Sequence, residues 1–259
     1  MKFVQHAEWS RRFRLPRDRR SPATQRGVTL IELVIAISLV ALLSVGMLFA
    51  MRVGLVAMDR SNATLMANRK VVSVQRILEQ QVANLMPVPA LCGLGGEAPQ
   101  TKIGFFQGEP QTLRFVSSYS LHEGDRGLPH ILEFQVIPGE NGAGVRLVVN
   151  ERVYTGPLST GALCLGVPPG APAPNFRPIE TGPLSFVLAD KIAYCRFTFK
   201  EHLPPYGEGQ WLARWNKPFF PTGIRVEMAP LDPSAGHLQL ITLTMPVHIN
   251  RDPLVHYDF

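Results

Sequence analysis

One acidic side chain, Glu32, stands directly before a long apolar run. The run, from Leu33 to Met51, contains nineteen residues and no charged side chain. Its length is close to the ~20 residues that a membrane-spanning helix needs. An ionised carboxylate there costs on the order of a few kcal/mol or more unless a cation pairs with it. We therefore expect Glu32 to be functional; the alternative is an ordinary anchor in which Glu32 snorkels to the membrane edge.

Residue patterns that carry catalysis are missing from the chain. The sequence contains no G-x-S-x-G elbow, Walker-type glycine loop, H-E-x-x-H motif or C-x-x-C pair. His122, Glu123 and Asp125 offer three potential metal ligands around Gly124, but their spacing matches no known metal loop, and a solvated turn is the expectation. The sequence thus predicts a protein without catalytic activity, metal or cofactor.

The positive charge is concentrated in residues 1–27, which we interpret as a basic leader. These residues hold eight basic and two acidic side chains and account for the whole net charge of +6. Nucleic-acid binding by the remaining, neutral part is therefore not expected. By the positive-inside rule the leader keeps its end cytoplasmic and places the part after Met51 outside. A twin-arginine signal at Ser10-Arg11-Arg12 is an alternative, although Val28 lies sixteen positions after Arg12.

The segment 28–86 is predicted to form one long helix, of which 28–51 spans the membrane. After the apolar run, large apolar residues recur at spacings of three and four, which indicates an amphipathic helix. Pro87 and Pro89 stop it, because proline removes a backbone donor and clashes with the preceding turn. We expect the last third of the helix to pack on the following domain through Val71, Val74, Leu78, Val82 and Leu85.

After a glycine-rich linker predicted at 87–101, residues 102–259 form a β-rich domain. Short runs of period-two alternation predict strands, and turn residues between 138 and 142 join two of these runs into a hairpin. The buried face of such a sheet is most economically covered by the amphipathic end of the helix. The predicted class is therefore α+β, a long N-terminal helix packed on an antiparallel sheet.

Two further features of this domain are the loop 156–183 and the cysteines. The loop holds seven prolines and five glycines, and it is interpreted either as a partner-binding arm or as a solvated loop without a defined role. In an oxidising periplasm, Cys92, Cys164 and Cys195 predict one disulfide and one free thiol, with all three pairings open. Cys195 shares strand parity with two phenylalanines, which places it inward.

The stretch Gly27-Val28-Thr29-Leu30-Ile31-Glu32, followed by Leu33 to Ile37, resembles the class III signal of type IV prepilins and pseudopilins. The resemblance implies that a prepilin peptidase cuts after Gly27 and that the new amino terminus of Val28 is methylated. Glu32 would then be the fifth mature residue, and its carboxylate would neutralise the terminal amine of a neighbouring subunit. The chain departs from the family at Val28, where phenylalanine is usual.

The strand Ala193 to Phe199 and the hairpin within Trp215 to Ile249 resemble, more loosely, J-type minor pseudopilins of type II secretion systems. This resemblance implies a scaffold subunit at the pseudopilus tip, with I-, K- and G-type pseudopilins as partners. It also implies a single pass through the inner membrane and a periplasmic C-terminal domain. The alternatives are a minor pilin of a type IV pilus and a membrane-anchored periplasmic enzyme or binding domain.

Overall fold

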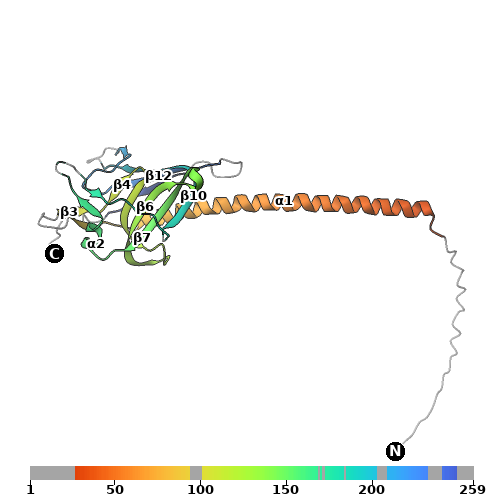
Figure 1. Cartoon of the computed structure of the whole chain (residues 1–259), viewed down its shortest axis with the longest axis horizontal. Helices are drawn as coiled ribbons and strands as arrows, with labels where there is room; N and C mark the ends of the chain where they lie inside the picture. Colours follow the sequence, from red (N-terminus) through yellow and green to blue (C-terminus); the bar gives the residue numbers. More distant parts are fainter. Residues whose placement is uncertain are drawn as a thin grey trace, which may run out of the picture. The chain divides into compact units, whose positions relative to one another are not determined.

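A computed structural model describes residues 27–93, 101–168, 170, 173–183, 185–202, 209–232 and 241–249 (Figure 1). The chain divides into two compact units, Met1–Met58 and Asp59–Phe259. In chain order, the described elements are α1 Leu30–Ala83, β1 Leu85–Met86, β2 Pro89–Cys92, β3 Thr101–Gly104, β4 Gln107–Glu109, β5 Thr112–Tyr119, β6 Arg126–Pro138, a 3-10 turn Glu140–Gly142, β7 Val145–Val153, α2 Pro157–Gly161, β8 Cys164–Gly166, β9 Asn175–Phe176, β10 Phe186–Lys200, β11 Trp211–Leu212, β12 Gly223–Pro230 and β13 Ile241–Pro246.

The helix α1 is shorter than the predicted range 28–86 at both ends. It begins at Leu30 because Thr29 acts as its N-cap. It ends at Ala83, after which Asn84 donates from its backbone and its side chain to the carbonyl of Gln80. The next residues, Leu85 and Met86, pair with β5 instead, since a residue before proline is driven toward extended conformations.

The second unit is built on one nine-stranded antiparallel sheet with the order β1-β5-β6-β7-β10-β12-β13, to which β4 and β11 attach beside β5 and β10. The central strands β6, β7, β10 and β12 can be followed in Figure 1. The predicted hairpin is confirmed as β6 and β7, in which Phe134 lies opposite Val149 and Pro138 opposite Val145. The α+β class predicted from the sequence is confirmed.

One face of the sheet packs on the C-terminal part of α1. Val74, Leu78 and Val82 are buried in the same apolar cluster as inward residues of seven strands. Every second residue of β10, from Cys195 to Phe199, belongs to this cluster, as the period-two pattern predicts. The helix stripe therefore covers the sheet as the sequence indicated.

The Leu78 side chain gives a direct test of this packing. It is 1 % exposed, so Leu78→Ala is expected to lower the free energy of unfolding by about 2–5 kcal/mol, because the cavity it leaves cannot fully collapse. Leu65→Ala, at a side chain that is 52 % exposed on the same helix, is the matched control. The measurement is denaturant unfolding of the detergent-solubilised chain; equal midpoints for the two variants would contradict the packing.

The other face of the sheet is covered by segments that the sequence left as a linker and a loop. Residues 89–92 of the predicted linker 87–101 form β2, which pairs with β3. Within the predicted loop 156–183, the structure forms α2, β8 and β9. These elements pack with Val116 and Ile131 of the sheet in a second apolar cluster. The predictions of a linker and a loop were therefore wrong for these residues. They form a second layer of the fold, because they bury apolar side chains against the sheet.

Candidate functional site

The residues around the predicted cleavage point lie just ahead of α1. Gly27, Val28 and Thr29 precede the first helical residue and are exposed. Val28 is 70 % exposed, and a Cβ added at Gly27 would meet nothing within 4 Å. The bond between Gly27 and Val28 is therefore sterically open in this chain, as a protease substrate requires.

Glu32 lies in the first turn of α1, three residues after the N-cap Thr29. Its backbone N–H donates to the Thr29 carbonyl at 3.1 Å and lies 3.4 Å from the Thr29 hydroxyl. A Thr followed three residues later by Glu is the capping-box pattern. This cap was not predicted from the sequence, although the pattern Thr29-x-x-Glu32 indicates it. The helix dipole also favours a carboxylate at this end.

No hydrogen bond or ion pair engages the Glu32 carboxylate within the described part of the chain. The helix that carries it is long and apolar enough to cross a membrane. Its side chains from Leu30 to Met58 are exposed. Together with the prepilin-type signal described below, the helix is consistent with a single-pass membrane anchor. Among the described residues, no cation lies beside this acid.

Two of the three cysteines lie in the second layer of the sheet domain, and the third lies on the opposite, helix-facing side of the sheet. Cys92 at the end of β2 is bonded to Cys164 at the start of β8, with their Cα atoms 5.4 Å apart. Cys195 is a buried free thiol on β10, and burial raises the pKa of this thiol to about 12. The structure thus selects one of the three pairings, and it keeps Cys195 protonated and inward-facing.

A buried charge cluster between the sheet and the second layer was not predicted. Arg114 of β5 is fully buried and donates to Glu133 of β6 at 2.9 Å. It also donates to the Gln107 side chain at 2.7 Å and to the Arg177 carbonyl at 3.1 Å. Burial lowers the pKa of Arg114, and Glu133 partly opposes this shift. The cluster ties the segment after β9 to the sheet.

The His122, Glu123, Gly124 and Asp125 stretch forms the turn between β5 and β6. The backbone N–H groups of Leu121 and His122 donate to the Glu151 carboxylate at 2.8 and 2.9 Å. The Tyr119 hydroxyl closes the turn by donating to the Gly124 carbonyl. Among the residues that the structure describes, no group of three or more His, Cys, Asp or Glu side chains could hold a metal ion.

A second, exposed charge cluster lies at the start of β7. Arg146 bonds Asp190 at 2.8 Å and also pairs with Glu140. These bonds raise the pKa of Arg146, and the Arg146 guanidinium lowers the pKa of Asp190. The pairs hold the turn after β6 against the bulge of β10 near Lys191, a residue with a positive φ of 55°. They lie in solvent and suggest a local structural role.

The comparisons with known proteins bear on the N-terminal segment. Residues 22–48 match the family model of the prokaryotic N-terminal methylation motif. The matched range includes Gly27, Val28 and Glu32. This match supports a place among type IV prepilin-like proteins, as a protein of the pilin or pseudopilin type. No curated protein was found to match the chain.

Proposed function

We propose that this prepilin-like chain is a minor pseudopilin of a type II secretion system, most similar to the J type. In this proposal a prepilin peptidase removes residues 1–27 and methylates the amino terminus of Val28. The helix then holds the protein in the inner membrane, with the sheet domain in the periplasm. The protein acts as a scaffold at the pseudopilus tip and has no catalytic activity.

The observation that carries the proposal is the isolated carboxylate of Glu32 inside the matched methylation motif. Cleavage after Gly27 would create an amine four residues before Glu32. An opposite charge within ~4–6 Å favours the ionised form of a carboxylate, so the amine of one subunit can pair with Glu32 of the next. Val28 lies just ahead of α1 and Glu32 lies in its first turn, so both groups would stand at one helix end, and their pairing would fix a register between neighbouring helices.

The J-type assignment rests on the loose sequence resemblance of Ala193 to Phe199 and of the hairpin within Trp215 to Ile249. The resembling segments are β10, β12 and β13, which lie side by side in the sheet. We propose I-, K- and G-type pseudopilins as partners on this basis. A minor pilin of a type IV pilus is the second candidate, because the same methylation motif serves pili and pseudopili alike.

The Glu32→Gln variant tests the pairing. It is expected to insert and to be cleaved like the wild type, because neither step needs the charge, and to be incorporated less into the fibre. The measurement is the yield of crosslinks to partner subunits in membranes, with Gln75→Glu, on the same helix but beyond the apolar run, as a matched control. Equal crosslinking and equal secretion would show that Glu32 is only a residue at the membrane edge.

The choice between a secretion system and a pilus is tested by partner exchange. Detergent-solubilised, processed chain is mixed with I- and K-type minor pseudopilins, and separately with minor pilins, and complex formation is followed by sedimentation. We expect complexes with the pseudopilins alone. Complexes with the pilins alone would favour the second candidate, and a hydrolytic activity of the sheet domain would contradict both.

A further inference from the structure

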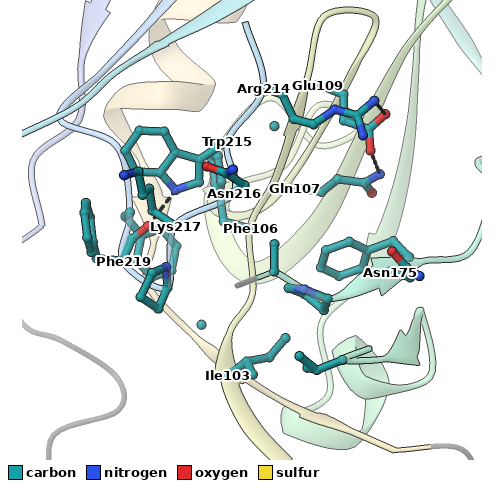
Figure 2. Close-up of a pocket in the computed structure, with 18 of the residues that line it drawn as sticks. Ile103, Phe106, Gln107, Glu109, Asn175, Arg214, Trp215, Asn216, Lys217 and Phe219 are labelled. Atoms are coloured by element: carbon teal, nitrogen blue, oxygen red, sulfur yellow. Dashed lines mark hydrogen bonds and ion pairs between the residues drawn. The ribbon is translucent and has the colours of Figure 1, made fainter. Parts of the chain in front are cut away.

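A pocket of about 340 Å³ lies in the sheet domain, where three segments meet (Figure 2). Its walls are β3 with the residues up to Glu109, the stretch 173–176, and the loop 214–220. Phe106 is one of the residues that line it, and its ring packs edge-on against Phe199 and Phe220. The volume falls within the ~300–1,000 Å³ of typical ligand pockets.

The walls of this pocket are fixed by contacts on their outer sides. Trp215 donates from Nε1 to the Phe219 carbonyl at 2.6 Å, which holds the loop closed on itself. On the opposite wall, Phe176 packs against Phe105 with ring centroids 5.7 Å apart. The bond from Arg114 to the Arg177 carbonyl anchors the same wall. The pocket is therefore preformed, which lowers the entropy cost of binding.

One wall is the strand β3, one edge of which pairs with no described residue. Among the described strands, β3 pairs only with β2. The Phe105 N–H donates to the Val88 carbonyl at 2.9 Å, next to the pair of Gly104 with Pro89. Bonding pairs alternate along an antiparallel ladder, so the backbone groups of Lys102 and Gly104 point away from β2. Residues 101–104 line the pocket, so a further strand can pair along this edge.

The charges around the pocket favour an acidic occupant. Its lining contains three basic side chains and one acidic side chain, Glu109. Lys217 pairs with Glu201 at 2.9 Å. Arg214 is 69 % exposed, and its guanidinium lies 3.9 Å from the Glu109 carboxylate. Lys102 has no ion pair within the described residues. A carboxylate placed at this rim would meet Lys102, which has no ion pair among the described residues, and Arg214, whose ion pair with Glu109 is long and exposed.

We propose that this pocket binds an extended segment of a partner protein that carries alternating apolar and acidic side chains. Its backbone adds a strand to the free edge of β3, and its carboxylates meet Lys102 and Arg214 at the rim. Alternate apolar side chains enter the pocket over Phe106, since successive side chains of a strand point to opposite faces. The interaction is independent of the N-terminal helix and goes beyond the assembly role proposed above.

The binding test uses the full chain in detergent and a labelled eight-residue peptide of alternating valine and glutamate, followed by fluorescence anisotropy. Lys102→Glu is expected to weaken binding by about tenfold, the value of one charge-assisted hydrogen bond. The control is Arg126→Glu, at an exposed residue that pairs with Tyr119 at the other end of β5. Loss of binding in both variants, or in neither, would overturn the proposal.

Strand pairing is tested separately with two N-methylated forms of the peptide. One is methylated at odd and the other at even positions, so each has one edge blocked. One form is expected to bind like the parent peptide and the other to lose binding; equal behaviour would overturn strand addition. Binding that appears only after truncation at Ile249, or self-association that Lys102→Glu abolishes, would assign the pocket to the chain itself and overturn the partner.

Discussion

The Gly27→Val variant is expected to keep residues 1–27 and to remain unmethylated when a prepilin peptidase is present. Wild-type chain should lose these residues and gain a methyl group on Val28. A Cβ at Gly27 meets nothing within 4 Å in this chain, so the substitution leaves the fold unchanged. The branched side chain of valine is expected to interfere only in the complex with the peptidase, where the enzyme must approach the backbone closely. Intact mass after co-expression measures both effects.

The matched control for this experiment is Gly46→Val. A Cβ added at Gly46 would also meet nothing within 4 Å. Gly46 lies in the apolar part of the helix, away from the cleavage point. The Gly46→Val variant should be cleaved and methylated like the wild type. If wild-type chain recovered from membranes carries the full leader, the pseudopilin and pilin proposals both fail; if Gly27→Val is still cut, the site has been assigned to the wrong bond.

The second large effect is expected at the buried ion pair of Arg114 and Glu133. Both side chains are about 1 % exposed and their charged atoms lie 2.8 Å apart. Arg114→Met removes the cation and leaves Glu133 buried with only the Arg152 guanidinium, at 3.3 Å. We expect a loss of about 3–5 kcal/mol in the free energy of unfolding, because an uncompensated buried charge is costly.

The double variant Arg114→Met with Glu133→Leu separates charge from packing. Replacing both partners with apolar side chains is expected to recover at least half of the loss, since buried pairs often contribute little net stability. Denaturant unfolding of the four chains gives the coupling energy as a double-mutant cycle. Arg196→Met, at an exposed side chain of β10, is the control. A double variant that is less stable than Arg114→Met would contradict the charge argument.

The elements that the sequence predicted correctly are those with a local signal. The stripe of Val74, Leu78 and Val82 has helical spacing, and the hairpin of β6 and β7 has alternation and turn residues close together in the chain. The N-terminal motif is also local, because its chemistry needs six consecutive residues. In each case one short window contains both the pattern and its physical reason.

The second layer of the sheet could not be predicted, because its contacts connect distant segments. Cys92 and Cys164 are separated by 72 residues, and nothing in either neighbourhood selects the partner. From the sequence, the side chains of Arg114 and Glu133 are predicted to face solvent, because charged residues alternate with apolar ones in both strands. Only the pairing of β5 with β6, and the cover of α2, β8 and β9, turns that face into an interior.

The continuity of α1 with β1 and β2 gives the domain a defined path for mechanical load. A pull along the helix first reaches β5 through the bond from the Ser118 N–H to the Asn84 carbonyl, and then through the pairing of the short β1 with β5. Beyond β1 the load reaches β2 and then the covalent bond from Cys92 to Cys164. Peeling of the chain from its helical end therefore stops at Cys92, and further extension must strip an entire cross-linked layer from the sheet.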